Sequence, residues 1–181
     1  FFVATGKMIM LIIMAVTGGT VQQVTVCGDY IMKNYMIRTL SGTDTLFSGA
    51  FANFKACIEA AVRDGVALCH ADLRGLNLLN AELDGGDFCH ASFSGSNLNG
   101  ANLSEALLDN ANFNGSTLFG TVLCESSLKR VSFDNAFFGA TDISYSDCSE
   151  LTLSTLSSFD LNFENVRSMA GTRYINPCGT I

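Results

Sequence analysis

From residue 66 onward, large apolar side chains recur at every fifth position of the chain. The series runs from Leu68 to Phe163, and 18 of its 20 positions hold Leu, Phe or Ile. A second series lies two positions earlier, and 14 of its 20 residues are Ala, Ser, Thr or Gly. Neither the helical period of about 3.6 nor the strand period of about 2 sustains a period of five. The pattern therefore predicts a repeat architecture in which each five-residue unit turns one large and one small side chain inward.

Individual units show which repeat this is. Residues 71–75 read Ala-Asp-Leu-Arg-Gly, and residues 101–105 read Ala-Asn-Leu-Ser-Glu. Over residues 66–166 this pattern resembles the pentapeptide-repeat family, whose unit reads Ala-Asp/Asn-Leu-x-x. The resemblance implies an all-β solenoid: a right-handed quadrilateral β-helix of about five coils, with four units per coil. Stacked coils would lie about 4.8 Å apart, the spacing of neighbouring strands.

The residue two positions after each large apolar residue is expected to turn a corner of the coil. Between Gly75 and Asn135, nine of these corner residues are Gly or Asn, which tolerate the positive φ of a type II turn. For five other corners we expect turns without a positive φ: Glu105, Glu125, Arg130, Ala140 and Tyr145.

The residues before the repeats predict a small cap on the solenoid. Residues 53–65 are expected to form one helix, with Asn53 as N-cap and Gly65 just past its end. Its apolar face would plug the open end of the β-helix. Two strands, 35–40 and 45–48, are expected to form a hairpin before this helix.

The chain is thus divided into three parts. Residues 1–65 form an N-terminal segment with the β-hairpin and the capping helix, residues 66–166 the β-helix, and residues 167–181 a C-terminal cap or tail. The apolar run 8–16 is too short for a bilayer, which needs about 20 residues. This run is either a buried strand or the remnant of a signal or anchor, and membrane contact through residues 1–19 is open.

Cysteine usage bears on the compartment. Seven Cys is an odd number, and no CxxC motif occurs. This favours reduced thiols in the cytoplasm, with a secreted or lumenal location as the alternative if residues 1–19 are a signal or anchor remnant.

The charge and the absence of catalytic motifs argue against two classes of function, nucleic-acid binding and catalysis. The net charge of −7 argues against direct binding of nucleic acid, which depends on Lys and Arg. Only two His are present, and the sequence holds no P-loop, HExxH or GxSxG motif. We therefore expect no enzyme and no cofactor.

Residues twenty apart would stack in ladders, so each face of the rod can be read from the sequence. One face collects acidic residues and no Lys or Arg: Glu82, Asp84, Glu105, Glu125, Asp142 and Glu164. The resemblance to quinolone-resistance pentapeptide proteins, which bind DNA gyrase, implies that such a face mimics DNA. The alternative is that the acidity maintains solubility.

A second face has Asp160 as its only charged residue, and its outward positions include Leu79, Phe119, Phe137 and Phe159. Exposed apolar patches mark contacts, so a protein partner or self-association is one interpretation. The other is that the apolar N-terminal segment lies across this face.

The pairs Cys69-His70 and Cys89-His90 are twenty residues apart and offer the donors of a tetrahedral zinc site. Adjacent residues on a flat ladder point in different directions, however, so repeated surface residues are the simpler interpretation. Further along, Asp109 with Lys129 and Arg130 with Glu150 are expected to form ion pairs between coils.

The function that these observations favour is a non-catalytic protein-interaction or structural module that presents flat faces to a protein partner. One alternative is a DNA-mimicking inhibitor or protector of a topoisomerase such as gyrase. Another is a structural subunit of a large assembly, such as a virion or membrane complex, with the N-terminal segment as an insertion arm.

Overall fold

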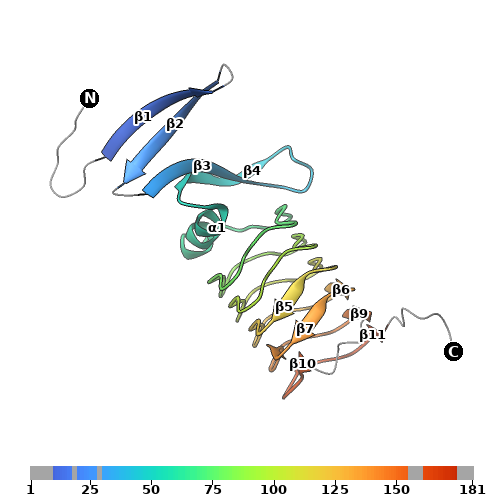
Figure 1. The fold of residues 1–181 in the computed structure, drawn as a ribbon. Coiled ribbons are helices and arrows are strands. Elements are labelled where there is room, and N and C mark those ends of the chain that lie inside the picture. Colours follow the sequence, from blue (N-terminus) through green and yellow to red (C-terminus); the bar gives the residue numbers. More distant parts are fainter. Residues whose placement is uncertain (1–9, 18–19, 28–29, 155–160, 175–181) are drawn as a thin grey trace.

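The computed structural model describes residues 10–17, 20–27, 30–154 and 161–174. An antiparallel sheet, one helix and a stack of coils follow one another along the chain (Figure 1). The coils form a right-handed quadrilateral β-helix, as the resemblance to pentapeptide-repeat proteins implies.

The sheet contains four strands: β1 (Met10–Thr17), β2 (Thr20–Cys27), β3 (Tyr30–Arg38) and β4 (Thr45–Phe51). They lie in the order β1-β2-β3-β4, and each pairs with its neighbour in antiparallel fashion. The predicted hairpin is the pair β3–β4, with longer strands than expected. The apolar run at the N-terminus becomes β1, and its partner β2 had not been predicted.

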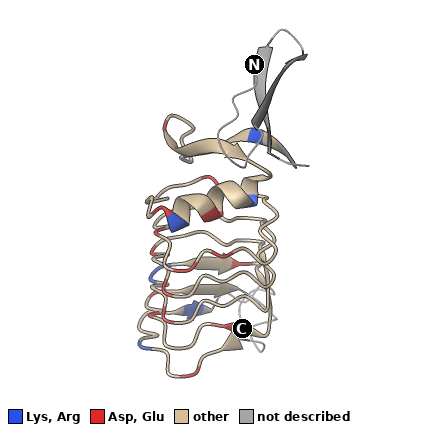
Figure 2. Ribbon diagram, turned by 90° about the vertical axis from the view of Figure 1, so that its left-hand side faces the viewer, with Lys and Arg blue, Asp and Glu red and all other residues tan. Residues whose placement is uncertain are grey.

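The helix α1 (Phe54–Arg63) begins and ends where its capping residues predict. Asn53 is the N-cap, and its side-chain oxygen accepts a hydrogen bond of 2.8 Å from the Ala56 N–H. Gly65 has a φ of +69°, the left-handed conformation expected just past a helix end. Cys57 and Ile58 are buried in the same core as the first coil, so α1 covers the N-terminal end of the β-helix (Figure 2).

Coils stack because residues twenty apart form parallel bridges, such as Asp72↔Ser92 and Ser92↔Asn112. Short strands form where bridges are continuous. These strands are β5 (Thr117–Phe119), β6 (Ser132–Asp134), β7 (Phe137–Gly139), β8 (Thr141–Asp142), β9 (Thr152–Ser154), β10 (Leu161–Asn162) and β11 (Arg173–Tyr174). In the last coil the spacing grows by one residue, since Asp147 bridges Ser168 and Arg173 pairs with Thr152.

The interior of the rod consists of the two predicted series of inward residues. Phenylalanines stack from coil to coil, with ring centroids 4.8 Å apart for Phe93 and Phe113 and 5.1 Å apart for Phe113 and Phe133. All three rings are buried. Each fully buried side chain of this size contributes about 1.5–3 kcal/mol, so the stack is a main source of stability.

Buried hydroxyls of the small series bond to the backbone of the coils. The Ser116 Oγ donates to the Phe113 carbonyl at 2.7 Å, and the Thr121 Oγ1 donates to the Leu98 carbonyl at 2.8 Å. Ser and Thr are therefore accommodated beside Ala, because each buried hydroxyl finds an acceptor.

The corners correct one expectation from the sequence. Glu105, Glu125, Arg130, Ala140 and Tyr145 all have a positive φ, between +50° and +60°. The coil requires this conformation whichever residue occupies the corner, because the corner N–H donates to a carbonyl of the next coil. The Glu105 N–H, for example, donates to the Cys124 carbonyl at 3.0 Å.

Candidate functional site

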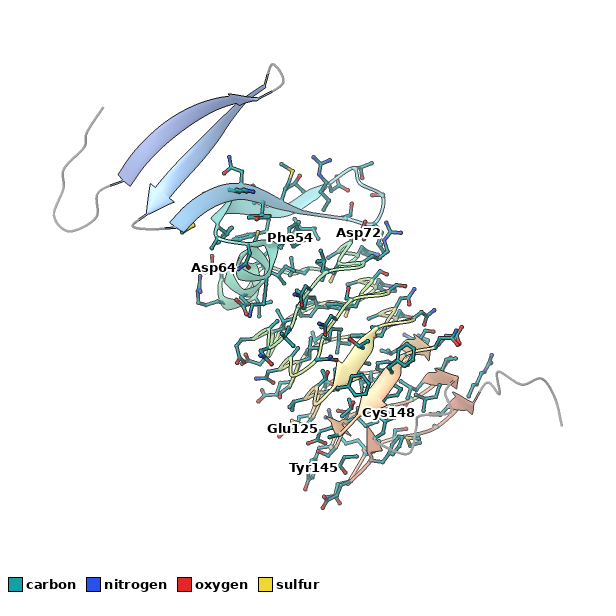
Figure 3. The ribbon with its side chains drawn as sticks, in the orientation of Figure 1. Phe54, Asp64, Asp72, Glu125, Tyr145 and Cys148 are labelled. Carbon is teal, nitrogen blue, oxygen red and sulfur yellow. The ribbon has the colours of Figure 1, made fainter. Side chains whose placement is uncertain are left out.

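The acidic face carries its carboxylates on successive coils. Glu105 and Glu125 occupy corresponding corners of neighbouring coils, and both are exposed. Glu125 and Tyr145 project from the same edge of the rod (Figure 3). Asp84 and Glu164 are exposed and Asp142 is half-buried, while Glu82 accepts a hydrogen bond of 3.3 Å from the Asn102 amide.

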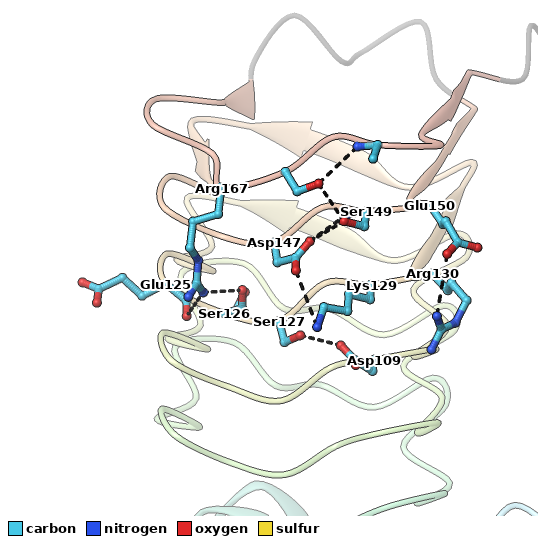
Figure 4. Close-up of polar contacts among 12 residues, drawn as sticks. Asp109, Glu125, Ser126, Ser127, Lys129, Arg130, Asp147, Ser149, Glu150 and Arg167 are labelled. Atoms are coloured by element: carbon cyan, nitrogen blue, oxygen red, sulfur yellow. Dashed lines mark hydrogen bonds and ion pairs between the residues drawn. The ribbon is translucent and has the colours of Figure 1, made fainter.

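Two arginines interrupt this face, so the expectation of a face without basic residues is wrong. The Arg167 Nη2 donates to the Glu125 carbonyl at 3.0 Å (Figure 4). The extra residue in the last coil lies here, because Arg167 and Ser168 both lie opposite Asp147: the Arg167 N–H donates to the Ser146 carbonyl, and Ser168 bridges Asp147. At the other end, Arg63 of α1 lines a surface hollow together with Glu82 and Asp84.

The apolar face has its strongest feature in two neighbouring rings, those of Phe119 and Phe137. Thr117 pairs with Phe137, and Phe119 pairs with Gly139, so the two phenylalanines lie diagonally across β5 and β7. The Phe119 ring lies directly against Gly139, where a Cβ atom would have no room. Phe119 is 48% exposed and Phe137 54%. We call these two residues the Phe patch.

Leu79, another residue predicted for the apolar face, does not belong to this patch. Leu79, although 46% exposed, lies two coils away, where it lines a hollow with Phe54 and Lys55 at the start of α1. Phe159 lies outside the described residues. The strands β1 and β2 lie beyond β3 and β4, at the end of the molecule away from the Phe patch (Figure 1). The described part of the N-terminal segment therefore does not cover it.

The four residues proposed as zinc donors separate into two groups. His70 and His90 occupy corners, each with a φ of +60°, and their rings stack with centroids 4.7 Å apart. The thiols of Cys69 and Cys89 instead meet the carboxylate of Asp87, and the three candidate ligand atoms lie within 4.8 Å of one another. We call these three residues the thiol cluster.

Hydrogen bonds orient the carboxylate of the thiol cluster. The Cys69 Sγ donates to the Asp87 Oδ1 at 3.2 Å, and the Cys89 N–H donates to the same oxygen at 3.2 Å. Burial raises the pKa of Cys69 and raises the pKa of Cys89 to about 11, and the Asp87 carboxylate adds to both shifts. Burial works to raise the pKa of Asp87 as well, but the hydrogen bonds that it accepts hold this pKa below its ordinary value.

A second cluster occupies the same three positions of the repeat further along the rod. The Lys129 Nζ lies 3.5 Å from the Asp147 Oδ2, and the Ser149 Oγ donates to the Asp147 Oδ1 at 2.6 Å (Figure 4). The sequence predicted an ion pair between Lys129 and Asp109, and this prediction is wrong. Lys129 pairs with Asp147 instead. Asp109 accepts a hydrogen bond from the Ser127 Oγ at 2.6 Å.

The predicted pair of Arg130 and Glu150 is confirmed, with 3.8 Å between the Arg130 Nη1 and the Glu150 Oε1. The error for Lys129 has a general cause. An outward residue that directly follows a large inward residue, as Cys69 follows Leu68, contacts the residue eighteen positions later on the next coil. It also lies next to the residue twenty positions later. Ladder spacing alone therefore overlooked Asp87 and Asp147, although an offset of eighteen would have found both.

Comparisons with known proteins support the fold. Residues 87–123 match the family model for pentapeptide repeats in 8 copies. Rfr23, a pentapeptide repeat protein from the cyanobacterium Cyanothece 51142, has a similar solved structure. It is 14% identical with a TM-score of 0.58, and the match covers 61% of this chain and 89% of that chain.

Two further solved structures align less well. A pentapeptide repeat protein from the thylakoid lumen of Arabidopsis thaliana is 21% identical with a TM-score of 0.45, over 52% of this chain and 72% of that chain. QnrB1, a plasmid-mediated fluoroquinolone resistance protein, is 20% identical with a TM-score of 0.48, over 58% of this chain and 60% of that chain. No curated protein sequence matches this chain.

The repeats of this chain match those of the pentapeptide-repeat family over residues 87–123, which confirms the resemblance seen in the sequence. The coils are those of the family's right-handed quadrilateral β-helix. Within the described ranges, no helix has the length and apolar character needed to cross a membrane.

Proposed function

We propose that this chain is a non-catalytic protein-interaction module, and that the Phe patch is its contact with a protein partner. The observation that carries the proposal is the pair of half-exposed rings, Phe119 and Phe137, on a face without charged residues at 97–100, 117–120 and 137–140. Aromatic residues are enriched at protein interfaces and at the positions that contribute most of the binding energy.

The backbone beneath the Phe patch supports this function. The Gly120 N–H donates to the Gly139 carbonyl at 2.6 Å, and the Phe137 N–H donates to the Ser116 carbonyl at 2.9 Å. Because these bonds hold both strands in place before any partner arrives, little backbone order has to be gained on binding. Preorganisation of this kind favours affinity.

The acidic face gives weaker support to the rival function, DNA mimicry toward a topoisomerase. A surface that imitates phosphates needs uninterrupted negative charge, and Arg167 and Arg63 lie among its carboxylates. The third function, a fixed subunit of an assembly with residues 1–19 as insertion arm, stays a prediction, as does membrane contact through these residues.

Site-directed photocrosslinking in the native cell tests the proposal. A photoreactive phenylalanine analogue replaces Phe119 in one version of the full chain and Phe137 in a second. Matched controls carry the same analogue in place of Ser94 on a polar face or Glu105 on the acidic face. We expect a discrete adduct from positions 119 and 137 that both controls lack.

The mass of the adduct identifies the partner. Twice the mass of the chain indicates self-association, and any other discrete mass indicates a different protein. Adducts that form from position 105 and not from positions 119 and 137 would overturn the proposal in favour of the acidic face. Equal labelling from all four positions would show that the Phe patch is no specific contact.

A further inference from the structure

We propose that the thiol cluster, Cys69, Cys89 and Asp87, is a binding site for a thiophilic divalent cation, and that Zn²⁺ is the ion it takes. This inference is independent of the Phe patch, which lies on another face of the rod. It also differs from the donor set suggested by sequence, because His70 and His90 stack on each other outside the cluster.

The three donor atoms already lie close together. The two thiol sulfurs and one carboxylate oxygen lie within 4.8 Å of one another, and the Cys69 Sγ is 3.2 Å from the Asp87 Oδ1. Tetrahedral zinc, with bonds of about 2.3 Å to sulfur and about 2.0–2.2 Å to oxygen, places its ligand atoms roughly 3.5–3.8 Å apart. Small rotations of these side chains therefore suffice to bring all three onto one ion.

The backbone holds the three donors at this spacing. The Leu68 N–H donates to the Asp87 carbonyl at 2.7 Å, and the His70 N–H donates to the Cys89 carbonyl at 2.9 Å. These bonds lie on either side of Cys69 and fix its coil against the next. The Cys89 N–H, which donates to the Asp87 Oδ1, also sets the direction of the carboxylate. The site is thus built on rigid elements.

The charge around Asp87 differs from that around Asp147. At the corresponding positions of later coils, the Asp147 carboxylate has the Lys129 ammonium group 3.5 Å away. Among the described residues, no Lys or Arg lies within ion-pair distance of Asp87, and the position corresponding to Lys129 is Cys69. A bound cation would stand next to Asp87 where the ammonium group stands next to Asp147.

The chemistry of the donors favours zinc. Two thiolates with one carboxylate suit zinc, whereas Ca²⁺ and Mg²⁺ favour sites made of oxygen alone. Binding releases the two thiol protons to the buffer, since the thiolate is the ligand. Three protein ligands leave the fourth position of a tetrahedral ion for a water molecule or for a group from a partner.

Metal titration of the full chain tests the site. The reduced, metal-free protein is titrated with Zn²⁺ against a chromophoric chelator, and with Co²⁺ while its absorption spectrum is recorded. We expect one equivalent of Zn²⁺, and a thiolate-to-cobalt charge-transfer band that Zn²⁺ abolishes. Cys69→Ser and Cys89→Ser should each lose that band.

A carboxylate variant and two controls complete the design. Asp87→Asn should weaken zinc binding at least about tenfold, since the loss of an outer hydrogen-bond partner alone typically costs about 10–100-fold. Cys124→Ser removes a half-buried thiol that contacts Ser104 and lies outside the cluster, so it should change nothing. The double variant His70→Gln, His90→Gln should also bind normally.

Several results would overturn the proposed zinc site. Absence of zinc binding by the wild-type chain would overturn the proposal, as would a full equivalent bound by Cys89→Ser. Loss of zinc binding in the histidine variant would also overturn the proposal, because it would show that His70 and His90 are zinc ligands. Circular dichroism confirms that each variant is folded, and Asp87→Asn tests the site independently if a serine variant does not fold.

Discussion

The inside and the outside of the coils follow different rules. Inside, each ladder repeats the same kind of residue, and the buried rings of Phe93, Phe113 and Phe133 stack one coil apart. Outside, the ladder that begins at Cys69 continues with Cys89, Asp109, Lys129 and Ser149, and its chemistry changes from coil to coil. The interior therefore determines the fold, whereas function has to be sought in particular combinations of outward residues.

The largest expected effect compares a phenylalanine inside with one outside. Phe113→Ala should lower the free energy of unfolding by about 3–5 kcal/mol, because it leaves a cavity between two stacked rings. The matched variant Phe119→Ala removes the same side chain from a half-exposed site and should cost much less. Urea unfolding followed by circular dichroism measures both. Similar losses would mean that the inner stack is no more important for stability than the surface.

The second prediction transfers the chemistry of one cluster to another. The thiol cluster and the Lys129–Asp147–Ser149 cluster occupy the same three positions of the repeat on equivalent backbone. Lys129→Cys combined with Ser149→Cys should therefore create a second zinc site and raise the bound metal from one equivalent to two. The single variant Lys129→Cys is the control and should keep one strong site. A stoichiometry of one in the double variant would show that the positions are not equivalent.

The third prediction concerns the corner residues of the coils, whose backbone has a positive φ. Glu105 has a φ of +58°, a conformation that costs an L-residue about 1–2 kcal/mol and glycine almost nothing. Glycine also has more conformational entropy to lose on folding, which offsets part of the relieved strain. Glu105→Gly should therefore raise the free energy of unfolding by up to about 1 kcal/mol.

Gly115 provides the reverse test of the corners. It has a φ of +67° with open space where a Cβ would lie, so Gly115→Ala should destabilise the protein by a similar amount through strain alone. Thermal or urea unfolding of both variants checks the two signs. Destabilisation by Glu105→Gly would contradict the view that the coil imposes a positive φ on whichever residue occupies the corner.

The same contrast explains what sequence predicts for this protein. The five-residue period identified the interior because each inward position has one dominant requirement, which is burial. Capping chemistry located α1, since Asn53 and Gly65 act within one turn of the helix ends. The prediction for the corner at Glu105 is wrong because it rests on side-chain preference, whereas the hydrogen bonds between coils impose the backbone conformation there.

Outward contacts were harder to predict because they depend on side-chain direction. Counting by twenty paired Arg130 with Glu150 correctly. The same count paired Lys129 with Asp109 and overlooked Asp87 as a partner of Cys69, since both contacts run diagonally to the next coil. Arg167 was missed for another reason: the extra residue in the last coil moves it out of register.

The smallest expected effect belongs to the outer polar cluster. The hydrogen bond from Ser149 is the main cause of the lowered pKa of Asp147, and Lys129 adds to it. A lowered carboxyl pKa stabilises the fold above the pKa of the unfolded state, about 3.9, and this contribution is lost as the pH falls through the lower folded value. Ser149→Ala should therefore cost at most about 1 kcal/mol at pH 6.

This difference between the wild type and Ser149→Ala should shrink as the pH falls and Asp147 becomes protonated, leaving the part that comes from the hydrogen bond between the Ser149 and Ser168 hydroxyls. Urea unfolding across this range, with a chelator present so that the thiol cluster contributes no metal-dependent term, measures it. Ser94→Ala is the control on a different face, because the Ser94 hydroxyl donates to a backbone carbonyl and no carboxylate is involved. A cost at Ser149 that does not change with pH would show that its hydroxyl stabilises the coil by some means other than its bond to the Asp147 carboxylate.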